Sequence, residues 1–502
     1  MTNKKNYDSD FCGSLPLNLV NMIQPHGYLL VLSRDLQIIQ ASENVADLLQ
    51  RPLKEIVPSS FKAWLEQTYQ ESAIEKIKAI HGDRGLLSLH FKGSATELFA
   101  IVHPKDDHII LELEPVQARN QFIDVFQHIK PSMTAIEQAP TVTEACKIVV
   151  DELKKLSGFD KVMVYSFDSD WNGTVLAEAM EPGMDAYLGL KFPASDVPKQ
   201  ARQLYQKNPF RLIPDREYKP VSLYPVINPL QNSFIDLSEC NLRGVASVHL
   251  EYLANMNVMA SMSTRIVIDG KLWGLISCHH RQAMNPGYEM CATFELLSSY
   301  FATRIASIRY REKAAHMADM QSRRLKLLES IFSHNSLTKG LLEGEEKVTD
   351  LLNAGGAAIY YQGSISTYGT TPATEDLENL QFWLQSRNLE TVLPITGLSE
   401  VYEDAGEYYQ EASGMLAIPI DLEKNEYIVL FRPEVIQTVK WGGNPDEAIQ
   451  FEDDKKKYHP RNSFKIWQET VHKRAEEWTE EELTIAEELK NFTNEYSKRD
   501  FG

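Results

Sequence analysis

The sequence lacks the long apolar runs and basic clusters that identify membrane proteins and nucleic-acid-binding proteins. No apolar run approaches the ~20 residues needed to cross a bilayer, and the opening residues MTNKKNYDSDFCG have no apolar core of a signal peptide. The net charge is −19 at pH 7, whereas surfaces for nucleic acid or anionic lipid need clustered lysine and arginine. We therefore expect a cytoplasmic protein whose partners include no nucleic acid and no membrane.

Cysteine is scarce and is not arranged in pairs. The five cysteines are odd in number, widely spaced and without a CxxC motif, so their spacing indicates neither a disulfide framework nor a zinc site. Four of them, Cys146, Cys240, Cys278 and Cys291, are expected to be buried. Cys12 lies in a polar leader ahead of the first apolar segment, where a thiol can be reached and can react. An idle terminal cysteine is an equally good interpretation at this point.

The motifs of common enzyme classes are also missing. There is no GxSxG elbow, phosphate-binding loop, HExxH pair or dinucleotide fingerprint, so catalysis has little support. His279 and His280 are adjacent on a predicted strand and must point to opposite faces, so they cannot easily ligate one metal ion. His249 with Arg243 forms a second candidate pair, although a single histidine on a strand is more often structural.

What the chain does contain is enough apolar material for two to four domains, since 43% of its 502 residues are hydrophobic and 24% are charged. Residues 28–50 predict a strand, a turn at Arg34-Asp35, a second strand and a helix capped near Ser42. A second block begins with a helix over 141–158 that Gly158 ends.

The second block continues with a strand over 160–168 and closes with a hairpin over 262–280, whose type I′ turn is expected at Asp269-Gly270. A third block, from 340 to 434, repeats the order helix, glycine, strand, which hints at two related folds. Between 431 and 467 lies an acidic, irregular excursion that is too long for an ordinary connection, so it is expected to be functional or disordered.

Two long helices are predicted near the end of the chain. About forty residues without proline or glycine, over 292–335, form one spine. Its apolar stripe favours a dimer seam or an interdomain strut over a purely local core. The stripe comprises Leu297, Phe301, Ile305, Ile308, Met317, Met320, Leu327 and Ile331. The last helix opens with the capping box Thr479 and Glu482, and the sequence stops in mid-helix, as if a further segment followed.

The stretch KFPASDVPKQARQLY, residues 191–205, places an acid between two prolines. Proline disfavours the helical conformation in the preceding residue, so Asp196 and Val197 are expected to be extended just before a helix that begins after Pro198. The Asp196 carbonyl is then left for water, another loop or a ligand.

The second block also gathers side chains suited to a particular ligand. Arginine and serine donors suit carboxylates, and an aromatic group could line an apolar slot. The donors are Arg211, Arg243, Ser261 and Ser263, and the aromatics are Tyr165, Tyr187, Phe192, Tyr205 and Tyr252. This mixture suits a long, flat, conjugated ligand with acidic arms, whereas each residue alone could equally be core, surface or turn.

Five motifs together resemble the photosensory part of a bacteriophytochrome over nearly the whole chain. They are IQPHG (23–27), FPASDVP (192–198), LWGLISCHH (272–280), WGG (441–443) and HPRNSF (459–464). The resemblance implies an α+β fold of tandem PAS, GAF and GAF-like PHY domains, with antiparallel sheets joined by long helices. The expected bounds are 1–122 for the leader and PAS domain, 123–312 for the GAF domain and 313–502 for the PHY domain, with a tongue at about 431–467.

The same resemblance implies a cofactor, the linear tetrapyrrole biliverdin, joined by a thioether to Cys12. The Asp196 carbonyl would accept bonds from the pyrrole N–H groups, His249 would hold them through a water, and His279 would reach the outermost ring's carbonyl. The propionates would be bound by Arg211, Arg243, Tyr205, Ser261 and Ser263. Tyr165, Tyr187 and Phe192 would surround the isomerising ring, and Val197, Pro198 and Tyr252 complete the expected cofactor-binding set.

Signalling is implied to run through the tongue. Arg461 would pair with the Asp196 carboxylate in one state, and the other residues assigned to signalling are Trp441, Gly442, Gly443, Pro460 and Ser463. Light would interconvert red- and far-red-absorbing states and change the tongue between strand and helix. The long helices would form a parallel homodimer that acts on an output domain, such as a histidine kinase or a diguanylate cyclase, or on a response partner, with no catalysis by this chain itself.

The chain departs from the family at VASVH, where Ala246 and Ser247 stand in place of the usual serine and proline. Two alternatives remain open. One is a sensor of the same domain order that binds another ligand or a noncovalent pigment without photoconversion. The other is an enzyme that uses His249 and His279, either to modify tetrapyrroles or for metal-dependent hydrolysis.

Overall fold

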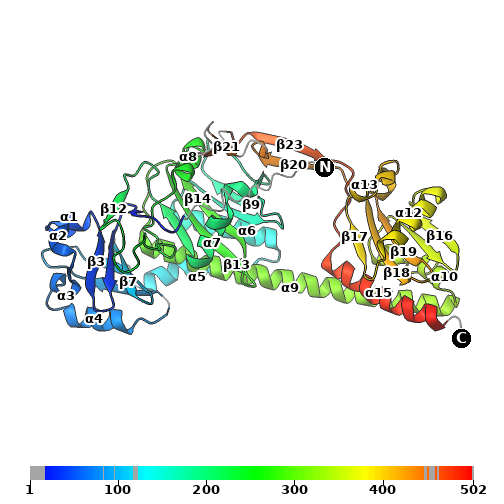
Figure 1. Ribbon diagram of the computed structural model, residues 1–502, viewed down its shortest axis with the longest axis horizontal. Helices are drawn as coiled ribbons and strands as arrows, with labels where there is room; N and C mark the ends of the chain where they lie inside the picture. Colours follow the sequence, from blue (N-terminus) through cyan, green and yellow to red (C-terminus); the bar gives the residue numbers. More distant parts are fainter. Residues whose placement is uncertain are drawn as a thin grey trace. The chain divides into compact units, whose positions relative to one another are not determined.

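The computed structural model describes residues 17–82, 84–94, 96–116, 122–445, 449–451, 458–460 and 463–499. These residues form three main sheets with flanking helices (Figure 1), and the strand pairing is antiparallel except at one position of the second sheet, which agrees with the α+β prediction. The chain divides into two compact units, which are 1–308 with 440–467 and 309–439 with 468–502. None of the helices in the described part of the chain is long and apolar enough to cross a membrane.

The first sheet is built mainly from the N-terminal residues and has the strand order β1-β12-β3-β2-β7-β6-β5, with β4 paired to β3. Its N-terminal elements are β1 Met22–Ile23, β2 Tyr28–Ser33, β3 Gln37–Ser42, α1 Val45–Leu49, α2 Leu53–Ile56, β4 Ser59–Ser60, α3 Phe61–Trp64, α4 Gln70–Ala79, β5 Gly85–Leu89, β6 Leu98–Pro104 and β7 His108–Pro115. The turn at Arg34-Asp35 is confirmed. The predicted cap is wrong, because α1 begins after Asn44 and the Ser42 hydroxyl instead accepts the Leu29 N–H at 2.9 Å.

The second sheet has the order β11-β13-β14-β8-β9-β10-β20-β23. The elements of this part are α5 Phe122–Gln138, α6 Val142–Ser157, β8 Lys161–Phe167, β9 Gly173–Met180, β10 Lys191–Phe192, the 3₁₀ helix η1 Ala194–Asp196, α7 Lys199–Lys207, β11 Phe210–Ile213, β12 Val221–Tyr224, α8 Ser247–Asn255, β13 Ala260–Ile268, β14 Lys271–His280 and α9 Gly287–His334. Gly158 ends α6 at φ 73°, and Asp269 and Gly270 have φ 51° and 73°, so the predicted stop and the predicted hairpin turn are both confirmed.

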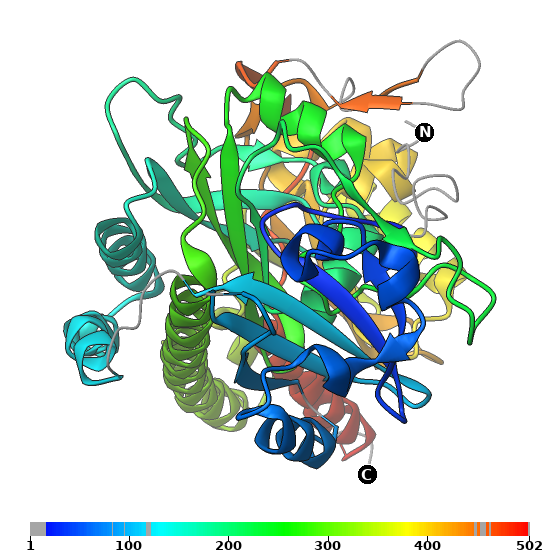
Figure 2. The same cartoon turned by 90° about the vertical axis from the view of Figure 1, so that its left-hand side faces the viewer.

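Helices α5, α6 and the first part of α9 cover one face of the second sheet (Figure 2). Alternate strand residues such as Val162, Val164 and Cys278 point into this core, because successive side chains of a strand face opposite ways. The intervening residues are therefore turned to the other face, where the candidate site lies. The four cysteines at 146, 240, 278 and 291 are free thiols and buried, as predicted.

The third sheet has the order β16-β15-β19-β18-β17. The remaining elements of the chain are α10 Leu337–Leu342, α11 Val348–Leu351, β15 Gly356–Tyr361, β16 Ser364–Gly369, α12 Thr374–Arg387, β17 Leu393–Ile395, α13 Leu398–Val401, the 3₁₀ helix η2 Glu403–Gly406, α14 Tyr409–Ala412, β18 Gly414–Asp421, β19 Glu426–Arg432, β20 Gln437–Gly442, β21 Ile449–Phe451, β22 Tyr458–Pro460, β23 Ile466–Val471 and α15 Glu480–Arg499. The predicted capping box is present, because Thr479 N–H donates to Glu482 at 2.8 Å and Glu482 N–H donates to the Thr479 hydroxyl at 3.2 Å.

The predicted spine is one continuous helix, α9, of 48 residues (Figure 1). Its stripe is not a dimer seam, however. Leu297, Phe301, Ile305 and Ile308 are buried in the core of the second sheet, and Met320, Leu327 and Ile331 are buried in the core of the third. The stripe thus belongs to two local cores, the interpretation that the sequence favoured less.

The excursion at 431–467 is more regular than its composition predicts. Within it, β20, β21, β22 and the start of β23 are strands, and β21 pairs with β22. One backbone pairing joins Lys191 of β10 to Trp441 of β20 in parallel, so this segment extends the second sheet. We keep the name tongue for residues 431–467.

Candidate functional site

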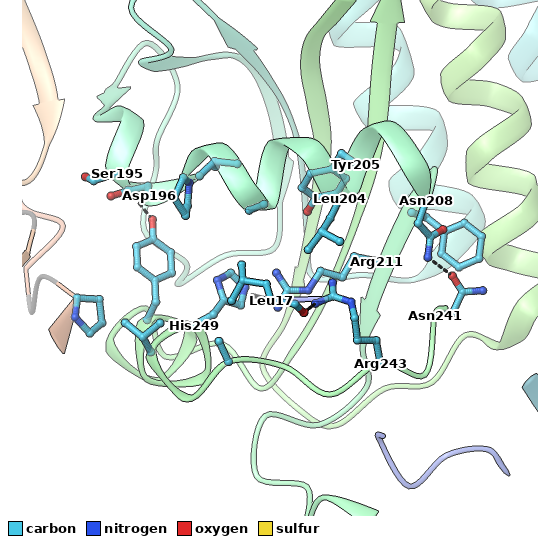
Figure 3. Close-up of a pocket in the computed structure, with 18 of the residues that line it drawn as sticks. Leu17, Ser195, Asp196, Leu204, Tyr205, Asn208, Arg211, Asn241, Arg243 and His249 are labelled. Atoms are coloured by element: carbon cyan, nitrogen blue, oxygen red, sulfur yellow. Dashed lines mark hydrogen bonds between the residues drawn. The ribbon is translucent and has the colours of Figure 1, made fainter. Parts of the chain in front are cut away.

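Two adjoining cavities open on the face of the second sheet that the long helices leave free. They enclose about 1150 Å³ and 670 Å³ not occupied by protein atoms, part of it open to solvent. Both are lined by Asp196, Val197, Tyr205, His249 and Tyr252, so they form one elongated site. Figure 3 shows the first cavity between α7 above and the segment around α8 below. An elongated, partly enclosed lining of polar and aromatic side chains suits a small-molecule ligand or cofactor.

The floor of the second cavity follows directly from strand alternation. Ser261 and Ser263 of β13 pair with His279 and Ser277 of β14, and all four line the cavity. Tyr165 of β8 lies on the same face. Alternate residues of three neighbouring strands therefore face the ligand space, and five of them present a hydroxyl, an imidazole or an aromatic ring to it.

A group of aromatic side chains lines part of this cavity. The Phe192 ring lies 5.6 Å from Tyr187 and 6.1 Å from Tyr165, measured between ring centroids. Gly173 makes room for this arrangement, because a Cβ there would lie 1.7 Å from the Tyr165 ring. The predicted apolar slot is thus built by Tyr165, Tyr187 and Phe192, with Tyr205 and Tyr252 also in its lining.

Behind the slot, a buried ion pair holds Tyr187. Lys161 Nζ lies 3.1 Å from Glu178 and 3.5 Å from the centroid of the Tyr187 ring. The Glu178 carboxylate also accepts the Tyr187 N–H at 2.9 Å. This pair was not predicted, because a lysine and a glutamate on separate strands carry no motif; only the unusual placement of Lys161 at the start of an apolar strand was a signal.

The part of the first cavity around Arg211 and Arg243 is cationic. Arg211 of β11 and Arg243, from the segment before α8, point into the space (Figure 3). Burial lowers the pKa of Arg211, and burial together with repulsion from Arg211 lowers the pKa of Arg243 to about 10. Among the residues that the structure describes, no carboxylate lies within ion-pair distance of either guanidinium, and Nε of Arg243 has no hydrogen-bond partner.

One backbone contact holds this cationic end. Arg243 Nη1 donates to the Leu17 carbonyl at 2.8 Å. The segment that carries Leu17 then runs between β12 and the segment that carries Arg243. Asn21 O accepts the Leu223 N–H at 3.0 Å, and Met22 O accepts the Gly244 N–H at 2.9 Å. The N-terminal strand segment therefore positions Arg243, and two like charges remain that need an anion.

Both candidate histidines face the ligand space in the neutral state. Burial, followed by the charges of Arg211, His279 and Arg243, lowers the pKa of His249 well below its usual range. Burial, followed by the charge of Lys161, lowers the pKa of His279 to about 3. A neutral imidazole has one donor and one acceptor nitrogen. His280 lies on the opposite strand face, as predicted, with Nδ1 accepting the Asp160 N–H at 3.2 Å.

The segment between the two prolines differs from its prediction. Asp196 is not extended, because its N–H donates to the Pro193 carbonyl at 3.0 Å and closes the 3₁₀ turn η1. Pro198 restricts only the residue directly before it, which is Val197, so it does not force Asp196 into an extended conformation. Val197 leaves the helical region at φ −126° and ψ 78°, and α7 begins after Pro198, as predicted. The Asp196 carboxylate accepts the Tyr252 hydroxyl at 2.8 Å.

The tongue contributes to the same site. Pro460 lines the first cavity, and Trp441 pairs with Lys191 next to the slot. His459 Nδ1 lies 3.0 Å from the Glu251 carboxylate, and the Phe464 ring meets Tyr252 edge to face at 5.2 Å. The tongue strands thus pack on α8 and β10.

The remaining predicted signalling residues differ in their places. Gly442 and Gly443 are buried, the first against Phe192, whereas Ser463 is exposed. Cys12 and Arg461 lie outside the described residues, so their predicted roles stay predictions. Ser277 was missed, although its position between Leu275 and His279 on an alternating strand was a usable signal.

Comparisons with known proteins agree with this architecture. Residues 12–116 match the family model described as a PAS fold, 141–305 match the GAF domain, and 320–500 match the phytochrome region. The chain is 33% identical over 495 residues to a bacteriophytochrome of Xanthomonas campestris pv. campestris, covering 96% of the chain and 78% of that protein. It is 35% identical over 493 residues to cyanobacterial phytochrome B of a Nostoc species, covering 96% of the chain and 65% of that protein.

Two solved structures are similar over almost their whole length. One is a bacteriophytochrome from R. palustris, with a TM-score of 0.85, 33% identity and coverage of 96% of this chain and 98% of that one. The other is the phytochrome photosensory core module of Stigmatella aurantiaca, with a TM-score of 0.84, 34% identity and coverage of 97% and 98%. The chain spans about two thirds of the length of the cyanobacterial relatives that it matches.

Proposed function

The chain belongs to the phytochrome family, and from this premise we propose that it is a red/far-red light-sensing module that binds the linear tetrapyrrole biliverdin. When bound, this pigment supplies light absorption and an isomerising double bond. The single observation that carries the proposal is the cavity's polarity: two guanidiniums without a carboxylate partner among the described residues stand at one end, and an aromatic slot stands at the other.

The residues present fit such a pigment. Arg211 and Arg243 would hold its propionates, because guanidinium and carboxylate form charge-assisted hydrogen bonds, and the partnerless Nε of Arg243 offers one donor. Tyr205, Ser261 and Ser263 supply further hydroxyl donors at the cavity wall. The Asp196 carbonyl would accept the pyrrole N–H groups, as the family resemblance implies.

The two neutral histidines bind the polar groups of the pigment without adding charge. His249 would contact the pyrrole nitrogens through a water, and His279 would donate to the carbonyl of the outermost ring. Tyr165, Tyr187 and Phe192 would surround that ring and set how it turns. The Lys161–Glu178 pair fixes the Tyr187 backbone, so it supports the slot from behind.

The Cys12 thiol would add across a vinyl group of the pigment, with the new bond formed at sulfur and the thiol proton passing to the other vinyl carbon. Signalling would then pass through the tongue, since Phe464 contacts Tyr252, whose hydroxyl binds Asp196. In one state Arg461 would pair with Asp196 and the tongue would change between strand and helix.

Dimerisation is supported by a different stripe of α9 from the one in the cores. Leu296, Tyr310, Leu325 and Phe332 are between 49% and 71% exposed and are separated by 14, 15 and 7 residues. At 100° per residue these spacings place all four on one side of the helix. We therefore propose a parallel homodimer that acts on an output domain or partner outside this chain, such as a histidine kinase or a diguanylate cyclase.

The test is an absorbance spectrum of the biliverdin-incubated protein before and after red light, repeated in acid urea. We expect reversible red-to-far-red conversion and a pigment that remains on the chain after denaturation. The Cys12→Ser variant should release its pigment in acid urea, whereas the matched Cys146→Ser variant should retain it, because Cys146 is buried in the core of the second sheet.

Other outcomes would favour the alternatives. A bound pigment that never photoconverts would support a ligand sensor of the same architecture. Turnover of a tetrapyrrole or a hydrolysable substrate would support an enzyme built on His249 and His279. A Cys12→Ser protein with a normal covalent adduct would refute the assigned attachment residue while leaving the cavity assignment standing.

A further inference from the structure

A second cluster of chemically reactive side chains lies where the first sheet meets the segment between β12 and α8. His103 is on β6 and Glu112 on the neighbouring strand β7, where Glu112 pairs with Ile101, two residues before His103. Both side chains are therefore on one face of the sheet. Cys240 approaches from the segment after β12, and the nitrogen, oxygen and sulfur atoms that these three can offer all lie within 4.8 Å of one another.

These three residues are removed from solvent. His103, Glu112 and Cys240 are 1%, 0% and 3% exposed. They are the one group of three or more potential metal-ligating side chains at this spacing in the described part of the chain. Clusters of exposed acidic groups are common and need no ligand. Burying a glutamate and a histidine beside a thiol, by contrast, costs folding free energy unless another group compensates the charge.

Neighbouring groups already hold the donor atoms in suitable orientations. The second Glu112 oxygen, Oε2, accepts the Leu242 N–H at 2.7 Å, while Oε1 and His103 Nε2 share a hydrogen bond of 2.7 Å that holds the two donor atoms side by side. On the other side of the ring, Nδ1 of His103 is buried without a hydrogen-bond partner and lies 3.8 Å from the Glu239 carboxylate. Metal-binding histidines commonly direct their second ring nitrogen at a carboxylate in this way.

We propose that His103, Glu112 and Cys240 bind a zinc ion that ties the first sheet to the segment carrying Arg243. One nitrogen, one oxygen and one sulfur donor suit zinc, which accepts all three types in a tetrahedral arrangement and leaves a fourth position for water. On binding, Cys240 releases its proton to solvent, and the proton shared by His103 Nε2 and Glu112 moves to His103 Nδ1, which faces the Glu239 carboxylate. Thiolate plus carboxylate then balance the two charges of the ion.

The location also supplies a route and a consequence. Cys240 lines the first cavity, so an ion can reach the cluster from the cavity side. Arg243 follows Cys240 by three residues, so a metal ion held by Cys240 fixes the backbone that positions this guanidinium. Lys105 pairs with Glu239 at 2.6 Å and keeps that carboxylate near the histidine.

The experiment uses the full, untagged chain produced without pigment, because a tetrapyrrole would compete for metal. After dialysis against micromolar zinc and then against buffer, elemental analysis should find one zinc per chain. Replacing zinc with cobalt(II) should give a thiolate-to-cobalt charge-transfer band. Cys240→Ser and His103→Gln should each lower zinc affinity about 100-fold or more and abolish that band, whereas the matched buried-thiol variant Cys146→Ser should behave as the parent.

Circular dichroism in a chelator separates metal loss from unfolding. If Cys240→Ser and His103→Gln do not fold, Glu239→Gln decides, because this side chain is 40% exposed and should lower zinc affinity about tenfold through His103. A parent chain that holds no stoichiometric zinc and gives no thiolate band with cobalt would overturn the proposal. Equal zinc affinity in the Cys240, Cys146 and Glu239 variants would also overturn it. The cluster would then be a metal-free His103–Glu112 hydrogen bond.

Discussion

The second and third sheets are built on the same plan but use one of their faces in opposite ways. Five neighbouring strands of the second sheet, counted from its β11 edge, have the order β11-β13-β14-β8-β9, and the five strands of the third have the order β17-β18-β19-β15-β16. Numbered along the chain among these five strands, both read 3-4-5-1-2. The repeated order of helix, glycine and strand in the sequence is thus explained by two related folds.

The difference lies in the face turned away from the long helices. In the third sheet this face presents Ala358, Tyr360, Val429 and Phe431, and residues of α12, α13 and α14 pack directly on it. In the second sheet the same face presents serines, a histidine and a tyrosine, and a cavity remains. An apolar face is filled by the chain's own helices, whereas a mixed polar and aromatic face leaves room for a ligand.

The comparison extends to one arginine in each unit. Arg432, at the end of β19, is 4% exposed, pairs with Glu482 at 2.5 Å and lies 3.7 Å from the centroid of the Trp478 ring. Arg243 has no such carboxylate among the described residues. A charge that is already paired stabilises the fold, and a charge that is enclosed without a partner is available to a ligand.

The largest expected effect comes from Arg432→Met. This change leaves the Glu482 carboxylate buried without its partner, so the free energy of unfolding of the pigment-free protein should fall by about 3–5 kcal/mol. Urea denaturation monitored by circular dichroism would measure the loss. A decrease below about 1 kcal/mol would show that the pair is not the structural element described above.

Arg243→Met should have the opposite pattern. This change removes an enclosed charge that has no carboxylate partner, so the free energy of unfolding of the pigment-free protein should stay unchanged within about 1 kcal/mol or rise. The affinity for biliverdin should fall about tenfold or more, because a propionate loses its charge-assisted bonds. Binding titrations followed by absorbance would test this. Equal destabilisation by the Arg243 and Arg432 changes would remove the distinction between the two arginines.

A smaller effect is expected where the tongue meets the cavity. A Cβ at Gly442 would lie 2.7 Å from the buried Phe192 ring, so Gly442→Ala should overpack this contact and cost about 1–3 kcal/mol. Gly406 in the third-sheet unit is the matched control, because a Cβ there meets nothing within 4 Å. Gly406→Ala should be neutral within about 0.5 kcal/mol in the same denaturation experiment. Equal behaviour of both variants would contradict the tongue packing described here.

Features fixed by local chemistry could be predicted from the sequence. The Asp269-Gly270 hairpin, the helix stop at Gly158 and the cap at Thr479 each depend on a few neighbouring residues. The grouping of Ser261, Ser263 and His279 around one cavity was anticipated through family motifs. Features that depend on which distant strands pair could not be predicted.

The Lys161–Glu178 pair and the cluster at His103 illustrate the second kind of feature. Their members come from different strands, or from a strand and a loop more than a hundred residues away, so no spacing rule applies. The error at Asp196 has another origin. Pro198 restricts only the residue directly before it, Val197. The conformation of Asp196 is instead determined by the i→i+3 hydrogen bond from its N–H to the Pro193 carbonyl.

The smallest effect expected is on the pH dependence of stability. His279 has its pKa lowered to about 3, against 6.5 for an exposed histidine, so between these values the unfolded chain binds a proton that the folded chain does not. This proton uptake on unfolding lowers the free energy of unfolding by about 1.4 kcal/mol for each pH unit below 6.5 and has no effect above pH 6.5. His279→Gln should therefore reduce the loss of unfolding free energy between pH 6.5 and 5.5 by about 1 kcal/mol in the pigment-free protein. If the His279→Gln variant kept the parent's pH dependence, His279 would not be the neutral, enclosed imidazole that distinguishes the ligand-binding sheet from its filled counterpart.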